Sequence, residues 1–374
     1  MSFLLNDCDA DPRKLKGTAS YNNYTKIETL FDKYLANKSF DDEKLIRAIK
    51  EDNWVEVQPL LQNNPHLIKM TEDGQNILHI SARFGHLDLF KHLLFKCPEL
   101  MLEYDDQGRS PIHLAIYYGQ TKFVQSVLME NPALLNQVTK NDQTLLHVSA
   151  LYGHTELVEW LLKTEFTVRK PDFMNILDQE GWNPLHSAAY TGQQKIVEFL
   201  LERNLASENK FDEMTQRGQN VLHIAALYGH VELVKWLYAN KPELTKAFDK
   251  NGWNPLHSAA YGGEIAVIEW LSKYPEILNQ PTQSDQTVLH IAVMYGHAKL
   301  VKILVSIPGL INKEDKSGMT ALELATKHGK NTIIKLLSQN STDSTVDSGK
   351  FLSEQLKLKE AIVLYEKHKY IDCV

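Results

Sequence analysis

Histidine is the residue type in this sequence with the greatest potential for chemistry. The chain has 374 residues and 15 histidines, and imidazole serves proteins both as a general base and as a metal ligand. Seven histidines recur at intervals of 33 to 39 residues, at His79, His113, His147, His186, His223, His257 and His290. Because this spacing is that of a structural repeat, the repeat itself accounts for these histidines, and we expect them to have no metal and no catalytic role.

Other residues keep register with these histidines and with Glu323, which takes the same place in a further copy. A good helix N-cap stands three positions earlier in every copy: Asn76, Ser110, Thr144, Asn183, Asn220, Asn254, Thr287 and Thr320. Glycine, which suits the left-handed residue that ends a helix, stands six positions later: Gly85, Gly119, Gly153, Gly192, Gly229, Gly263, Gly296 and Gly329. Each copy therefore predicts a short first helix, and an apolar second helix follows it.

The period and the motif resemble those of the ankyrin repeat, in which each unit is a hairpin turn plus two helices. The decapeptide GWNPLHSAAY, which occurs at Gly181–Tyr190 and again at Gly252–Tyr261, is typical of the pattern. The resemblance implies an all-α solenoid of helix-turn-helix units with β-hairpin loops. It covers about eight repeats, and a degenerate capping repeat with Ile46 in the histidine position precedes them.

The sequence divides into four expected regions. Residues 1–41 form an N-terminal extension with an amphipathic capping helix, and residues 42–339 form the repeat array. Residues 340–350 read as a flexible linker, and residues 351–374 as a C-terminal helix and tail. Insertions next to the repeat of His186 are expected in loops near 163–170 and 204–211.

The repeats alternate between two versions of the motif. Proline stands two positions before His113, His186 and His257, whereas an aliphatic residue stands there in the copies of His79, His147, His223 and His290. Duplication of a two-repeat unit accounts for this pattern, and the sequence alone indicates no physical requirement for it.

Composition excludes several functions. The formal net charge of −7 gives no basic surface for nucleic acid. The three cysteines form no C-x-x-C pair, which favours a reducing compartment and argues against a zinc site. No apolar run is long enough to span a bilayer, and the N-terminus is a poor signal peptide. We therefore expect a monomeric cytoplasmic protein that has no membrane span and no cofactor.

Two tryptophans suggest where a partner binds. Trp182 and Trp253 stand between the hairpin glycine and the N-cap, a position that holds glutamine, arginine or methionine in other copies. In ankyrin-like arrays this position lies on the concave face, beside the last residues of the first helix, where Tyr190, Tyr228 and Tyr261 stand. Tyrosine and tryptophan are enriched at binding hot spots, so we expect these five residues to form an exposed partner site. In the alternative, the rings only pack across adjacent repeats.

The sequence contains no nucleophile elbow, phosphate-binding loop, kinase set or zinc-protease motif, so we expect no enzyme. The predicted function is a non-catalytic scaffold or adaptor that binds a protein or peptide partner. Two alternatives stay open at this point: a pathogen effector, secreted into the host cytoplasm, that engages host proteins through the repeats, and an inhibitory subunit of an enzyme.

Overall fold

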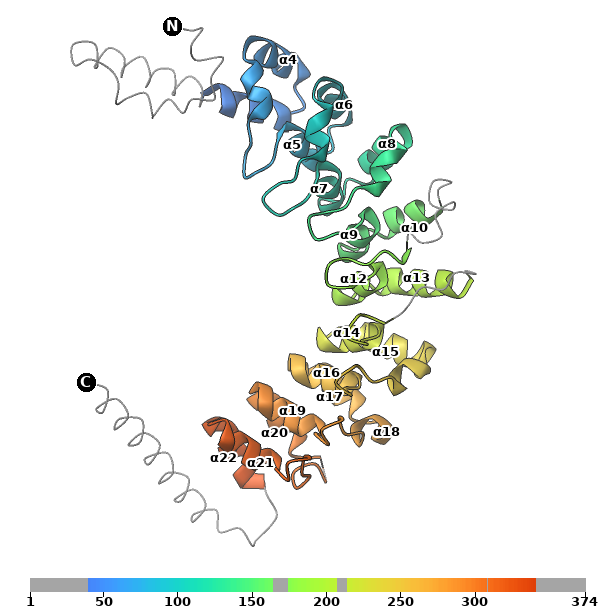
Figure 1. Ribbon diagram of the computed structural model, residues 1–374, viewed down its shortest axis with the longest axis vertical. Coiled ribbons are helices and arrows are strands. Elements are labelled where there is room, and N and C mark those ends of the chain that lie inside the picture. Colours follow the sequence, from blue (N-terminus) through green and yellow to red (C-terminus); the bar gives the residue numbers. More distant parts are fainter. Residues whose placement is uncertain (1–39, 164–173, 207–213, 308, 341–374) are drawn as a thin grey trace, which may run out of the picture. The chain divides into compact units, whose positions relative to one another are not determined.

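The structure is a computed structural model that describes residues 40–163, 174–206, 214–307 and 309–340, and these residues are mainly helical (Figure 1). A helix over residues 40–50 comes first. The α-helices that follow are α4 (Trp54–Asn63), α5 (Ile77–Phe84), α6 (Leu87–Lys96), α7 (Pro111–Tyr117), α8 (Thr121–Glu130), α9 (Leu145–Leu151), α10 (Thr155–Lys163), α12 (Pro184–Tyr190), α13 (Gln194–Ala206), α14 (Val221–Leu227), α15 (Val231–Asn240), α16 (Pro255–Gly262), α17 (Ile265–Leu271), α18 (Pro275–Leu278), α19 (Val288–Tyr295), α20 (Ala298–Leu304), α21 (Ala321–Lys327) and α22 (Asn331–Asn340).

The helices come in pairs that differ in burial. The first helix of a pair is short and nearly enclosed: in α5, every residue from Ile77 to Ala82 is buried. The second helix buries one stripe, which in α6 consists of Leu89, Phe90 and Leu93. A short helix that is apolar on all sides needs neighbours on all sides, so the first helices form the core and the second helices cover one side of it.

The predicted first-helix boundaries are confirmed. Among the side chains that cap their helix are those of Asn76, Thr144 and Asn220, which accept hydrogen bonds from backbone N–H groups of the first turn. Ser110 is an exception, because its hydroxyl contacts the His113 imidazole instead. All eight predicted stop glycines have positive φ, as at Gly263 with φ 78°.

The chain divides into two compact units. The first comprises residues 1–187 and 203–211, and the second comprises residues 188–202 and 212–374. In the first unit, α7 lies against both α5 and α9; in the second unit, α16 lies against both α14 and α19, and α19 also lies against α21. Each unit is thus built from first helices stacked side by side.

The connections are compact. Second helices are followed by prolines that open 3₁₀ helices: η3 (Pro98–Leu102), η4 (Pro132–Asn136) and η6 (Pro242–Lys246), with η2 (Pro65–Lys69) after α4. The hairpin loops of the described residues contain isolated β-bridges, such as Val138 with Thr144. In the same residues, no helix has the length and apolar character needed to cross a membrane.

Several sequence expectations fall outside the described residues. These are the capping helix before residue 40, the linker and helix after residue 340, and most of the two insertions. The second insertion is described at its start, where α13 continues as helix to Ala206 in place of the loop expected there.

Candidate functional site

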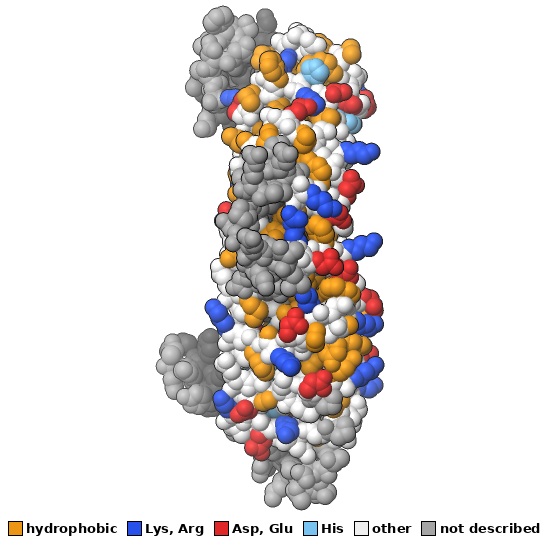
Figure 2. Space-filling model, turned by 90° about the vertical axis from the view of Figure 1, so that its right-hand side faces the viewer, with side chains coloured by type: hydrophobic (Ala, Val, Ile, Leu, Met, Phe, Trp, Pro, Cys, Tyr) orange, Lys and Arg blue, Asp and Glu red, His pale blue; other side chains and the backbone are white. Residues whose placement is uncertain are grey.

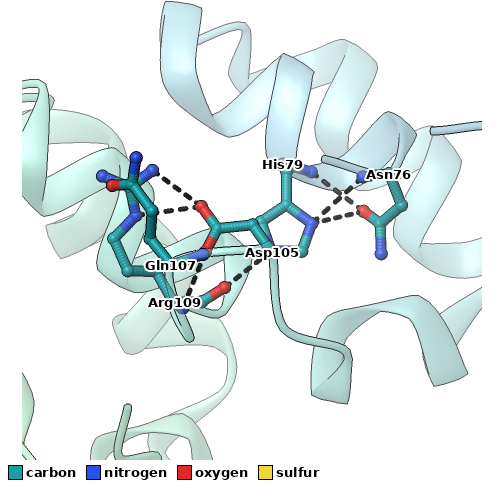
Figure 3. A network of polar contacts seen from close by, with 5 residues as sticks. All are labelled: Asn76, His79, Asp105, Gln107 and Arg109. Carbon is teal, nitrogen blue, oxygen red and sulfur yellow. Dashed lines mark hydrogen bonds and ion pairs between the residues drawn. The ribbon is translucent and has the colours of Figure 1, made fainter. Parts of the chain in front are cut away.

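His79, His147, His223 and His290 each join their repeat to the next one, because Nε2 lies within hydrogen-bond distance of a carbonyl oxygen in the following hairpin. Nδ1 of His79 accepts a hydrogen bond from the backbone N–H of its own N-cap, Asn76 (3.3 Å). The other ring nitrogen, Nε2, therefore carries the proton, and it lies 2.9 Å from the carbonyl oxygen of Arg109 in the following hairpin. Figure 3 shows this arrangement, in which one neutral imidazole caps its own helix and holds the next loop.

A buried aspartate shapes the loop that the histidine holds. Asp105 accepts hydrogen bonds from the backbone N–H groups of Gln107 and Arg109 at 3.0 and 2.8 Å (Figure 3). The Arg109 guanidinium donates to the second oxygen of the same carboxylate at 2.7 and 2.9 Å. The negative charge of Asp105 is thus paired although its side chain is buried, as a buried charge requires.

The same arrangement recurs at the two tryptophans. The Trp182 and Trp253 carbonyls each lie 2.9 Å from a histidine Nε2, that of His147 and that of His223 respectively. Their backbone N–H groups donate to Asp178 and Asp249 at 2.8 and 2.9 Å. The loop backbone that carries each tryptophan is therefore fixed from two directions.

The structure supplies a physical correlate of the alternating motif. Aspartate shapes the hairpins that precede the proline-containing helices, as Asp105 and Asp249 do. Aspartate also shapes the hairpin before α21, which lacks the proline: Asp315 accepts from the backbone N–H of Met319 at 3.1 Å. Threonine shapes the hairpins before α9, α14 and α19, where the hydroxyls of Thr139, Thr215 and Thr282 each accept from a glutamine backbone N–H at 3.1 Å. The two kinds of hairpin also differ at the position that Trp182 and Trp253 occupy. Hairpins shaped by threonine have glutamine there, whereas hairpins shaped by aspartate have arginine, tryptophan or methionine.

The histidines that follow the stop glycines form a second set of links. Nε2 of His230 lies 2.7 Å from the Tyr190 carbonyl oxygen, and Nε2 of His297 lies 2.8 Å from that of Tyr261. Each contact reaches back from one repeat to the end of the first helix before it. Tyr190 and Tyr261 are thus presented on a backbone that the neighbouring repeat holds in place.

Within the second unit the tyrosines form a continuous surface. The rings of Tyr190 and Tyr228 meet edge to face at 4.5 Å between centroids, and those of Tyr261 and Tyr295 do the same at 4.5 Å. Each of the four is 39 to 43% exposed. Trp253 lies beside the second pair, at 5.5 Å from Tyr261 and 6.3 Å from Tyr295. We call these five residues the aromatic row.

Two phenols of the aromatic row, those of Tyr228 and Tyr295, have a raised pKa. Burial raises the pKa of Tyr228, and the neighbouring hydroxyls of Tyr190 and Tyr261 raise it further. Burial and Tyr261 also raise the pKa of Tyr295. Tyr228 and Tyr295 therefore offer neutral hydroxyl groups, which both donate and accept hydrogen bonds, on side chains that are 41 and 43% exposed.

The structure places the five predicted site residues as follows. Tyr190, Tyr228, Trp253 and Tyr261 belong to the second unit and lie in the aromatic row, whereas Trp182 belongs to the first unit. The tryptophans were expected to be exposed, and this was wrong: both are partly buried. Trp253 loses exposure because its ring packs against Tyr261 and Tyr295. Sequence reasoning also did not include Tyr295 in the predicted site, although it occupies the same position in its helix as Tyr228.

The first unit carries related residues at its own helix ends. Tyr117 meets Tyr118 and Tyr152 edge to face, at 4.9 and 4.7 Å between ring centroids. The Arg83 guanidinium lies over the Tyr118 ring at 4.8 Å, and that of Arg109 lies over the Tyr117 ring at 4.7 Å. This surface differs from the aromatic row in having positive charge among its rings.

A separate aromatic cluster lies on second helices. Tyr238 meets Trp270 at 5.1 Å and Tyr274 at 4.3 Å, and its hydroxyl donates to Glu276 at 3.1 Å. Burial and this glutamate raise the pKa of Tyr238 to about 12. Figure 2 shows one face of the molecule, on which charged side chains of both signs lie among hydrophobic ones.

The recurring histidines are suited to structure more than to proton transfer. Burial lowers the pKa of His113 to about 3 and that of His257 to about 4. Burial also lowers the pKa of His79, His147, His223 and His290, although each bonds a carbonyl. In the part of the chain that the structure describes, no group of three or more His, Cys, Asp or Glu side chains is placed to hold a metal ion.

Comparison with known families agrees with this architecture. A family model described as ankyrin repeats in three copies matches residues 15–136, 123–212 and 274–348, and a second, described as ankyrin repeats in many copies, matches residues 222–271. The curated proteins include no match to the chain. The matched segments cover well over half of the sequence, and the chain belongs to the ankyrin-repeat family.

Proposed function

We propose that the protein is a non-catalytic scaffold that binds a protein or peptide partner through the aromatic row. Ankyrin repeats are generally protein–protein interaction modules and generally lack catalytic activity. The observation that carries the proposal is the set of four tyrosines, each about two-fifths exposed, at the ends of first helices. Large aromatic side chains of this exposure are the type that dominates binding energy when a partner covers them.

The way the row is held supports the same proposal. His230 and His297 fix the backbone at Tyr190 and Tyr261, and His223 fixes the backbone at Trp253. A surface that is ordered before binding loses little conformational entropy when the partner arrives. Tyrosine adds to this advantage, because it has few rotatable bonds for its large contact area.

Trp182 is proposed as a partner contact on the first unit. It has the same backbone environment as Trp253, with a histidine on its carbonyl and an aspartate on its N–H. Arg109 and Met319 fill the same position in the other hairpins that an aspartate shapes. Tryptophan is therefore not required by the hairpin itself, and recognition gives it a role.

The experiment is affinity capture from cell extract followed by comparison of matched variants. The test variants are Tyr228→Ala and Trp253→Ala, and the control is Tyr274→Ala, which removes a ring from the second-helix cluster instead. The proposal requires the captured partner to be lost with the first two and kept with the control. Equal capture by all three folded variants would refute the aromatic row as the binding surface.

A further inference from the structure

We propose that the first unit has a recognition site for an acidic peptide segment, centred on Arg83. This inference rests on the proposed function, because it assigns a partner chemistry to one surface of the scaffold. The site comprises Arg83, Phe84, Tyr117, Tyr118 and Tyr152, and we call it the Arg83 cluster. Its occupant is a segment in which a carboxylate side chain stands beside apolar side chains.

The Arg83 guanidinium lies over two aromatic rings. It lies over the Tyr118 ring at 4.8 Å and over the Phe84 ring at 5.5 Å. Its backbone is also fixed, because the Gln120 side chain donates to the Arg83 carbonyl at 3.0 Å. A guanidinium stacked in this way keeps the N–H groups at its edge available for a carboxylate, which it can bind with two parallel hydrogen bonds.

Comparison with the other arginine of this surface shows why Arg83 is the residue concerned. Arg109 is also stacked on a tyrosine, but it forms a salt bridge of 2.7 Å to the buried Asp105. Arg83 forms no ion pair with any residue in the described ranges, and the cation–π contacts with Tyr118 and Phe84 are its side-chain interactions there. The surface therefore carries one positive charge for which the described residues supply no carboxylate.

The rings beside Arg83 favour a peptide that has apolar side chains next to its carboxylate. Phe84, Tyr117, Tyr118 and Tyr152 are 37 to 42% exposed, so they present apolar area next to the cation. A nucleic-acid backbone would bring many negative charges to a chain of net charge −7, which disfavours it. A protein segment with a single acidic residue among apolar ones matches both the charge and the rings.

The test begins with a displayed library of random peptides selected on the full chain. A synthetic copy of an enriched peptide is then compared with its amide version, in which Asp or Glu is replaced by Asn or Gln. Wild type should prefer the acidic peptide about tenfold, and Arg83→Gln should abolish that preference. The control Lys122→Gln removes a positive charge from the exposed side of α8 and should keep the preference.

The outcomes separate this inference from the proposed function. Peptides that need Tyr118 for binding but show no acidic preference would overturn the Arg83 site and leave the scaffold role intact. The same preference in Arg83→Gln would also overturn it, as would a single-stranded oligonucleotide that competes in an Arg83-dependent way. If no peptide is enriched and neither Tyr118→Ala nor Trp253→Ala affects any captured partner, both proposals fail.

Discussion

Nε2 of His223 lies 2.9 Å from the carbonyl oxygen of Trp253, so the histidine that caps one helix also fixes the loop that carries a proposed recognition residue. The His223 side chain is fully buried, and its contact with the Trp253 carbonyl is partly buried. The fold and the proposed binding surface therefore depend on the same hydrogen bond, and variants can be chosen that affect one, the other or both.

The first prediction concerns the histidine itself. His223→Ala should destabilise the protein by about 1–3 kcal/mol, because it leaves the Trp253 carbonyl and the Asn220 N–H without their buried partner. Chemical denaturation followed by tryptophan fluorescence measures the change. The control is His66→Ala, which removes an exposed imidazole. Equal midpoints for the two variants would show that the inter-repeat bond contributes nothing.

The second prediction concerns Asp249, which accepts from the backbone N–H groups of Asn251 and Trp253. Asp249→Ala should cost about 1–3 kcal/mol, because these partly buried donors lose their acceptor and the carboxylate of Asp249 is itself buried. Asp249→Thr should be much milder, since Thr215 shapes the preceding hairpin with its hydroxyl. Thermal melts of the two variants test the idea, and an equal loss in both would show that the two hairpin types are not interchangeable.

The third prediction is a loss of stability in acid. The pKa of His113 is lowered to about 3 and that of His257 to about 4, from an unfolded value of 6.5. The unfolded chain therefore binds protons first as the pH falls. The stabilisation is fully present above about pH 6.5 and is lost progressively towards pH 4 and below, by up to about 1.4 kcal/mol per pH unit for each group.

A histidine variant separates this effect from the titration of carboxylates. In His257→Gln, denaturation midpoints between pH 6.5 and 4 should fall less steeply than in wild type, whatever the stability of the variant at pH 7. Parallel pH profiles for the two proteins would mean that His257 does not titrate as its burial implies.

Much of the fold could be predicted from the sequence because local chemistry sets it. The Asn220 cap and the Gly229 stop bracket a helix of seven residues, and the structure has that helix as α14. The acceptor of the His223 Nε2 could not be predicted, because it lies 30 residues away, across a packed interface. The partial burial of Trp253 depends on Tyr295 in the following repeat, a contact that no short-range pattern encodes.

The site was predictable in part for a related reason. Tyr190 and Tyr261 share one position in the repeat and Tyr228 holds the next one, so their similar exposure follows from the end of the first helix at which all three stand. The sequence could not show that the charge of Arg83 lacks a carboxylate partner, because that depends on which arginine the fold places beside an acidic side chain. Arg109 has Asp105 within its own hairpin, and Arg83 has none among the described residues.

The central claim is that the aromatic row is a surface for a partner and not merely packing between repeats. The most direct measurement is titration calorimetry of the captured partner with Trp253→Ala, together with the thermal midpoint of the same variant. We predict a loss of binding free energy of about 2 kcal/mol or more with a nearly unchanged midpoint. Normal binding would contradict the claim, and so would a midpoint lowered as far as that of His223→Ala, because the ring would then serve the fold.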